Sequence, residues 1–190
     1  ASRYWNWFMV NHWPAPAPGR DTRDSRYYSF AFASNMPKLN TNEPEVIAYV
    51  CGLCEHWVGE YGVDAIRFDV GNEVSHRLLK ELHRRLRAIR PDVYLLGEIW
   101  HDASPWLEGD EYDAVMNYPL QQAVKGFFAH KDKTARMLAW DLYRCMGMYR
   151  RQTGQVMFNL LDSHDTDRLF TRAGSEDAFF QQLAMLFTLP

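Results

Sequence analysis

The feature that most constrains the fold is a repeated alternation of short apolar segments with longer helical ones. The apolar segments are rich in β-branched and aromatic residues, which is typical of buried strands. They predict strands over 63–70, 93–98, 114–116 and 156–161. Apolar residues at helical spacing predict helices over 42–58, 73–90, 119–150 and 176–188. Because no alternating hairpin strands separate these segments, we expect parallel strands joined by crossover helices.

Local signals set the expected helix boundaries. Asn42 is the predicted N-cap of the first helix, with Pro44 in its first turn, and Pro91 should end the second helix. A polar break near Lys131–Lys133 divides the long helical region.

Parallel sheets of this kind are either open and doubly wound or closed into barrels. No glycine-rich phosphate loop follows the first two strands, which lead into Val70-Gly71-Asn72-Glu73 and Ile99-Trp100-His101. The missing loop argues against a nucleotide-binding sheet.

Each predicted strand ends in polar residues. The four ends carry Arg67 with Asp69, Glu98, Asn117 with Tyr118, and Ser163-His164-Asp165. Any one of these charges could simply cap a strand. Carboxylates at three of the four ends instead favour a barrel active site, which the loops after the strands build.

Two of these carboxylates suit complementary roles. Arg67 and Asp69 are two residues apart on a strand, so they should point to the same side, and the cation should keep Asp69 ionised. Glu98 lies among Leu95, Leu96 and Trp100, an apolar setting that should raise its pKa and suit a proton donor. A retaining glycosidase needs such a pair, about 5–5.5 Å apart.

Composition limits the other classes of function. The 190 residues are 47% hydrophobic, which is enough for a core, and the net charge of −3 without a basic run speaks against a nucleic-acid partner. No run of 18 apolar residues indicates a membrane span. The three cysteines include Cys51 and Cys54 in a C-x-x-C pair, which could be redox-active or metal-binding. Their helical setting favours packing instead.

The first 42 residues read differently from the rest. Pro14–Gly19 alternates proline with alanine, and a polar stretch follows from Arg20 to Arg26, so we expect an irregular surface excursion here. The chain starts at Ala1 in loop-like sequence and stops at Pro190 inside an apolar run. We therefore expect a piece cut from a longer protein.

Three stretches resemble motifs of the α-amylase family, glycoside hydrolase family 13. They are Gly62–Asp69 (GVDAIRFD), Gly97–Trp100 (GEIW) and Asn159–Asp165 (NLLDSHD). Met36–Asn40 (MPKLN) resembles a further motif of the neopullulanase and cyclomaltodextrinase branch, and the likeness extends over nearly the whole chain.

The resemblance implies a role for each matching residue. Asp69 would be the nucleophile held by Arg67, and Glu98 would be the general acid and base. Asp165 would bind sugar hydroxyls with His164 beside it, and Trp100 would offer an aromatic face on the leaving-group side. The remaining substrate-binding candidates are His76, Asn117 and Tyr118. Ser75 stands where relatives often carry Asp.

The resemblance also implies a partial (β/α)₈ TIM barrel. Residues 43–190 would supply about strands four to seven with their helices, and residues 1–42 would be the tail of a loop domain inserted after strand three. The family's first motif and its eighth strand would lie outside the chain. A half-barrel leaves sheet edges unpaired, so we expect the fragment alone to be inactive.

The expected function is retaining hydrolysis of α-1,4-glucans such as cyclodextrin, pullulan or maltooligosaccharides. A glucan transferase or an α-1,6-glucosidase uses the same machinery, and a non-catalytic scaffold or binding subunit is a further alternative. We expect no cofactor and no metal within this chain, although calcium is common in the wider family. The implied partner is the α-glucan, with a homo-oligomer possible for the full-length protein. Free thiols and the habits of the branch favour the cytoplasm.

Overall fold

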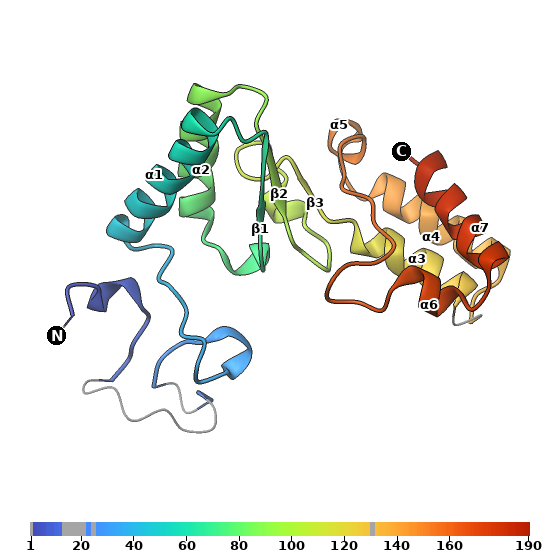
Figure 1. The fold of residues 1–190 in the computed structure, drawn as a ribbon, viewed down its shortest axis with the longest axis horizontal. Helices are drawn as coiled ribbons and strands as arrows, with labels where there is room; N and C mark the ends of the chain where they lie inside the picture. Colours follow the sequence, from blue (N-terminus) through green and yellow to red (C-terminus); the bar gives the residue numbers. More distant parts are fainter. Residues whose placement is uncertain (1, 13–21, 24–25, 130–131) are drawn as a thin grey trace. The chain divides into compact units, whose positions relative to one another are not determined.

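The computed structural model describes residues 2–12, 22–23, 26–129 and 132–190 (Figure 1). The helices are α1 Pro44–Glu60, α2 His76–Ile89, α3 Tyr118–Phe128, α4 Ala135–Gly147, α5 Arg151–Gly154, α6 Leu169–Ala173 and α7 Glu176–Thr188. The strands are β1 Ala65–Phe68, β2 Tyr94–Gly97 and β3 Ala114–Val115. The chain forms two compact units, which are Ala1–Gly62 with Val74–Arg90, and Val63–Glu73 with Pro91–Pro190.

The first unit is built on α1 and α2, which pack side by side (Figure 1). Glu43, not Asn42, is the N-cap of α1, so the predicted cap is wrong by one residue. Proline pushes the preceding residue into extended backbone, and Glu43 accordingly has φ −69° and ψ 126°. The helix therefore starts at Pro44 itself.

Helix α2 starts at His76, later than the predicted residue 73, because Gly71–Glu73 forms a separate 3-10 turn. Ser75 is the N-cap, and its hydroxyl accepts a hydrogen bond from the Leu78 amide at 3.2 Å. The predicted apolar face is confirmed in its centre, where the residues are buried. They are Leu78, Leu79, Leu82 and Leu86.

The predicted irregular character of residues 1–42 is confirmed for the described part. Short 3-10 turns occur at Trp5–Trp7 and Phe30–Phe32. Isolated bridges join Phe8 to Leu39, Val10 to Tyr27 and Ser29 to Pro37. The proline-rich segment Pro14–Gly19 and most of the polar stretch that follows it lie outside the described residues.

The second unit contains a parallel sheet of three strands in the order β1-β2-β3. Its register pairs Phe68 with Gly97 and Gly97 with Val115. The predicted parallel strands of a partial barrel are confirmed, and α2 links β1 to β2 along the chain. Because the last residues of β1 and β2 are paired with each other, the residues that follow these two strands lie at the same edge of the sheet.

Strand β1 is less buried than predicted. Ala65 and Arg67 are exposed, whereas Ile66 and Phe68 are half-buried. The reason is that β1 is an edge strand of this sheet and pairs only with β2 among the described residues. Strand β2 fits the prediction better, because Leu95, Leu96 and Gly97 are all buried.

The predicted fourth strand over 156–161 is wrong as a regular strand. Its only described ladder contact is a parallel bridge between Met116 and Phe158. The Asn159 amide donates to the Met157 carbonyl at 3.1 Å instead of to a neighbouring strand. This local bond turns the backbone away, although the segment still runs beside β3.

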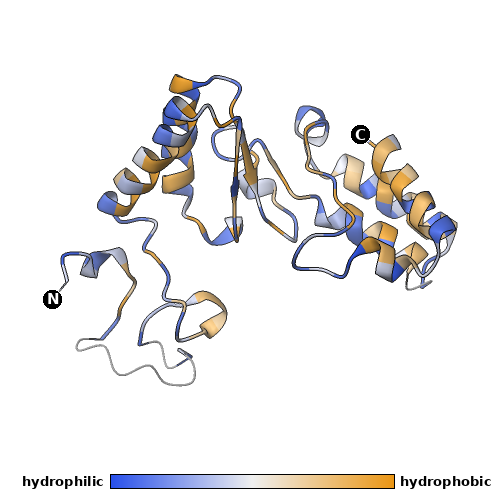
Figure 2. Ribbon diagram, in the orientation of Figure 1, coloured by the Kyte–Doolittle hydropathy of each residue, from blue (hydrophilic) through white to orange (hydrophobic). Residues whose placement is uncertain are grey.

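Helices of the second unit pack around a hydrophobic core of their own. The long predicted helical region divides into α3 and α4, and of the predicted break Lys131–Lys133 only residues 132 and 133 are described. The last predicted helix is confirmed as α7, along which hydrophobic residues run (Figure 2). The buried centre of this core comes from α3, α6 and residue 161, and consists of Leu120, Val124, Leu161 and Leu169.

Cys51 and Cys54 are buried in α1 with free thiols, which confirms the packing interpretation. No helix in the described ranges is long and apolar enough to cross a membrane.

Candidate active site

The candidate site lies in the second unit, where the residues after β1 and β2 leave the same edge of the sheet. Phe68 and Gly97 are register partners, so Asp69 and Glu98 follow at equivalent positions on neighbouring strands. The amide of Glu98 donates to the Phe68 carbonyl at 2.9 Å, which continues the pairing past the strand ends. The predicted proximity of these two carboxylates is therefore built into the sheet.

Arg67 joins the two carboxylates. Its Nη1 lies 3.0 Å from Asp69 Oδ1, and its Nη2 lies 3.2 Å from Glu98 Oε2. The Nε of the same guanidinium donates to the Met116 sulfur at 3.3 Å, which fixes the plane of the group. The planar fork of arginine can face two acceptors at once, whereas a lysine offers a single point of charge. One side chain thus sets the spacing of the pair.

Glu98 and Asp69 differ strongly in exposure. The Glu98 side chain is 7% exposed, against 72% for Asp69. Trp100 Nε1 donates to Glu98 Oε1 at 2.9 Å, and the Val70 amide donates to Glu98 Oε2 at 2.9 Å. Together with Arg67, these contacts satisfy the buried carboxylate in its charged form.

The predicted raised pKa of Glu98 is wrong for this structure. Burial does act to raise the pKa, as the apolar neighbours suggested. The hydrogen bonds from Trp100 and Val70 and the positive charge of Arg67 act in the opposite direction and prevail, so the pKa of Glu98 is lowered. These contacts favour the carboxylate form of Glu98.

A strained backbone corner supports this arrangement. Val70 has φ 47°, which is unfavourable for a β-branched residue. The Gly71 amide donates to the Glu98 carbonyl at 2.9 Å, and the Tyr112 hydroxyl donates to the Gly71 carbonyl at 3.1 Å. These bonds hold Val70 with its amide directed at Glu98. The sequence did not predict that Val70 contacts Glu98, because the contact is made by a main-chain amide and not by a side chain.

Trp100 is the exposed aromatic residue of the site, with 41% of its surface accessible. Its ring stacks on Tyr118, with centroids 4.0 Å apart and planes at 14°. Tyr118 is 0% exposed, and its predicted contact with a sugar remains a prediction. Its ring is covered by Trp100 and by the core.

Asp165 and His164 lie on a turn after the segment 156–161. His164 Nε2 is 3.2 Å from Asp165 Oδ2, and both side chains are exposed, at 66% and 46%. The Asp165 amide donates to Ser163 Oγ at 3.2 Å, and the Ser163 amide donates to Thr166 Oγ1 at 2.8 Å. The turn is thus held by its own side chains, and Ser163 is a contributor that we did not predict.

Asn117 and His76, two further predicted substrate-binding residues, lie at the starts of helices. Asn117 is the N-cap of α3, where its Oδ1 accepts from the Leu120 amide at 3.3 Å and its Nδ2 donates to Asn159 Oδ1 at 2.8 Å. Its predicted contact with a sugar remains a prediction. His76 begins α2 in the first unit, and its predicted contact remains a prediction.

Within the described ranges, no group of three or more His, Cys, Asp or Glu side chains is arranged to hold a metal ion. The carboxylates of the site are instead paired with Arg67, and the exposed Asp165 is paired with His164.

Comparison with known proteins decides the family. Residues 7–189 match the model of the alpha-amylase catalytic domain, which is nearly the whole chain. The chain belongs to the alpha-amylase family. The resemblance seen in the sequence is therefore confirmed.

The relatives carry names from the branch that Met36–Asn40 suggested. The chain is 45% identical over 189 residues to a cyclomaltodextrinase of Geobacillus thermopakistaniensis, covering 100% of this chain and 31% of that protein. It is 41% identical over 189 residues to neopullulanase 2 of Thermoactinomyces vulgaris, covering 99% and 31%. A solved cyclomaltodextrinase structure superposes with a TM-score of 0.92 at 44% identity, covering 98% of this chain and 32% of that one. The chain thus spans about a third of the relatives' length.

Proposed function

We propose that these residues form the catalytic centre of a glycoside hydrolase that cleaves α-glucans with retention of anomeric configuration. The observation that carries the proposal is the double contact of Arg67, which holds Asp69 and the buried Glu98 beside each other. An exposed carboxylate next to a buried one, joined by one cation, suits a nucleophile and an acid/base. Cyclomaltodextrin is the first substrate to test, since a 45% identical relative is named a cyclomaltodextrinase.

In the first step, an oxygen of Asp69 attacks the anomeric carbon while Glu98 gives its proton to the departing glycosidic oxygen. The bond from the anomeric carbon to that oxygen breaks, and a glycosyl ester on Asp69 forms. The hydrogen bonds to Glu98 and the charge of Arg67 favour its charged form, so the loss of one hydrogen-bond donor would favour proton donation. Trp100 is the exposed donor, and a sugar that accepts its Nε1 proton in place of Glu98 would raise the pKa of Glu98.

In the second step, Glu98 takes a proton from water, and the resulting hydroxide oxygen attacks the anomeric carbon and releases Asp69. Esterified Asp69 no longer carries a negative charge, which favours the ionised form of a neighbouring carboxylate. The bonds from Val70 and Arg67 act in the same direction. Asp165 and His164 would bind sugar hydroxyls from the exposed turn and stabilise the distorted ring.

The rest of the assignment remains a proposal. Residues 43–190 would contribute part of the barrel and residues 1–42 the tail of the inserted domain, within a longer protein whose relatives are about three times the length of this chain. The free thiols support a cytoplasmic location. A homo-oligomer and a calcium site would belong to the full-length protein. Transfer to sugar acceptors is the alternative outcome of the second step, in which a sugar hydroxyl replaces water.

The test uses the full-length protein with cyclomaltodextrin and with pullulan, and follows the first product by proton NMR. We expect the α-anomer to appear first and turnover to be lost in Asp69→Asn. An initial β-anomer would overturn the retaining mechanism, and turnover in Asp69→Asn would overturn the assignment of the nucleophile. The 190-residue chain alone should show no measurable hydrolysis, and activity that disappears in its Asp69→Asn variant would contradict this expectation.

A further inference from the structure

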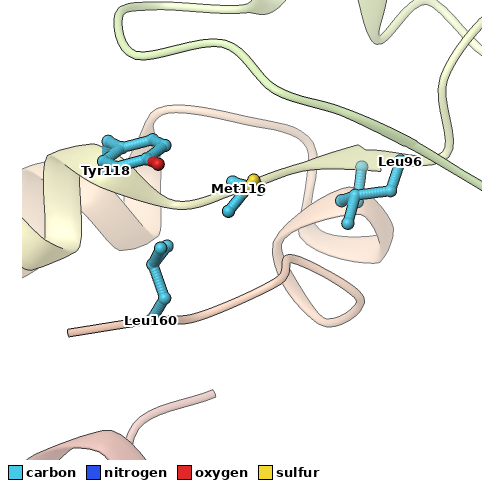
Figure 3. Packing of buried hydrophobic residues seen from close by; sticks show 5 residues of the cluster. Leu96, Met116, Tyr118 and Leu160 are labelled. Carbon is cyan, nitrogen blue, oxygen red and sulfur yellow. The ribbon is translucent and has the colours of Figure 1, made fainter. Parts of the chain in front are cut away.

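Tyr118 is a buried titratable residue for which the mechanism above has no use. It begins α3, immediately after β3 and Met116–Asn117 (Figure 3). Its side chain belongs to a buried cluster with Leu96, Met116 and Leu160, and its exposed fraction is 0%. A tyrosine hydroxyl in such a place needs a hydrogen-bond partner.

The ring of Tyr118 supports one half of the site. Trp100 stacks on it with centroids 4.0 Å apart and nearly parallel planes. The same Trp100 donates its Nε1 proton to Glu98 Oε1 at 2.9 Å. The ring of Tyr118 therefore packs against Trp100, the side chain that donates a hydrogen bond to Glu98.

The hydroxyl of Tyr118 meets the other half of the site. It lies 3.3 Å from Ser163 Oγ. The same Ser163 oxygen accepts the Asp165 amide at 3.2 Å, at the start of the turn that presents Asp165. A shift of Ser163 would therefore move the backbone of Asp165.

Electrostatics agree with this central position. Burial is the main reason that the pKa of Tyr118 is raised. The charges of Glu98 and Asp165 raise the pKa further, whereas the bond with Ser163 and the charge of Arg67 lower it. The hydroxyl thus lies within the field of both carboxylates and stays protonated.

We propose that Tyr118 is a positioning residue that couples the Glu98–Trp100 pair to the Ser163–Asp165 turn. Its ring fixes Trp100, and its hydroxyl fixes Ser163. It touches no reacting atom, because it is fully buried beneath Trp100. The role in turnover rests on the proposed function, whereas the mechanical link between the two segments does not.

The kinetic test is a double-mutant cycle in the full-length protein with cyclomaltodextrin. Tyr118→Phe keeps the ring and removes the hydroxyl, and Ser163→Ala removes its partner. One neutral hydrogen bond corresponds to about a two- to tenfold change in rate, and we expect each variant to lower kcat by that amount with little change in KM. The double variant should be no slower than Ser163→Ala, because both changes break the same connection.

Two further variants separate positioning from stability. Tyr94→Phe removes another tyrosine hydroxyl of the second unit, which donates to the Val156 carbonyl at 2.6 Å. It should lower the Tm without changing kcat. Ser163→Thr retains a hydroxyl and should recover most of the kcat lost in Ser163→Ala. The proposal is overturned if Tyr118→Phe behaves like Tyr94→Phe, or if the losses in the double variant multiply.

Hydrogen exchange supplies a readout that does not depend on turnover. The Asp165 amide should exchange faster in Tyr118→Phe and in Ser163→Ala, and at the unchanged rate in Tyr94→Phe. Unchanged exchange in Tyr118→Phe would refute the link itself. A wild-type protein that turns over no α-glucan would refute the proposed function, while the exchange rates would still decide whether Tyr118 holds the turn.

Discussion

Gly97 precedes Glu98, and the space beside it is filled by the ring of Tyr112. A Cβ added at this glycine would lie 2.7 Å from both Cδ2 and Cε2 of Tyr112, and 3.2 Å from its Cγ. Tyr112 is only 2% exposed, and its hydroxyl is bonded to the Gly71 carbonyl, so the ring has little freedom to withdraw. Gly97→Ala is therefore an overpacking change in a filled core.

Overpacking of this kind costs about 1–3 kcal/mol, and we expect the upper part of that range because the ring is held at both ends. Gly52→Ala is the matched control. Gly52 lies in α1, is exposed, and a Cβ there would meet nothing within 4 Å. Removing a glycine from a helix interior should stabilise the protein by about 0.5–1 kcal/mol. The two glycine-to-alanine changes should thus have opposite signs.

The assay is urea-induced unfolding of the full-length protein, with kcat measured alongside. Gly97→Ala should lower the urea midpoint. It should also reduce kcat, because a displaced Tyr112 would lose its bond to the Gly71 carbonyl, which helps to hold Val70 with its amide directed at Glu98. Adding Tyr112→Leu should cost less in the Gly97→Ala background than in wild type, since the smaller side chain leaves room for the methyl group. A Gly97→Ala midpoint equal to or above that of Gly52→Ala would refute the reasoning.

Three other predictions concern Trp100, Arg67 and the two cysteines of α1. Trp100→Phe removes a hydrogen bond that lowers the pKa of Glu98, so this pKa should rise and the general acid should stay protonated to higher pH. The alkaline limb of the pH profile of kcat/KM should therefore move to higher pH. A shift of this limb to lower pH would contradict the assignment. Arg67→Lys should reduce kcat/KM by about tenfold to a hundredfold, because an ammonium group loses one of two charged contacts; an unchanged value would show that the double contact has no function. Burial raises the pKa of Cys51 and of Cys54 to about 11, so a thiol reagent at pH 8 should label these cysteines only after denaturation, and rapid labelling of the native protein would contradict their buried packing.

The sequence predicted the features that depend on neighbours along the chain. Helix α7 could be predicted because the helical spacing of its apolar residues is a local pattern. The positions of Asp69 and Glu98 at the ends of neighbouring strands, and of Asp165 after an apolar segment, could be predicted for a similar reason. The parallel order of strands then brings the first two together at one edge.

The features that were missed depend on contacts between distant segments. The lowered pKa of Glu98 depends on Val70, 28 residues earlier, and on Arg67. The burial of Tyr118 likewise depends on another segment, because its ring is covered by the stacked ring of Trp100. The single bridge at Phe158 is a different case, because it depends on the local bond from the Asn159 amide to the Met157 carbonyl, which apolar content does not specify.

The central claim is that Asp69 becomes covalently attached to the sugar, and trapping that intermediate tests it most directly. A fluorinated α-glucosyl fluoride slows both steps and allows the ester to accumulate on the full-length protein, which can then be digested and examined by mass spectrometry. The account predicts one added glycosyl mass on the peptide that contains Asp69, and no added mass in Asp69→Asn. Label on another carboxylate, or an active protein that turns over substrate with no trapped species and an inverted product, would contradict it.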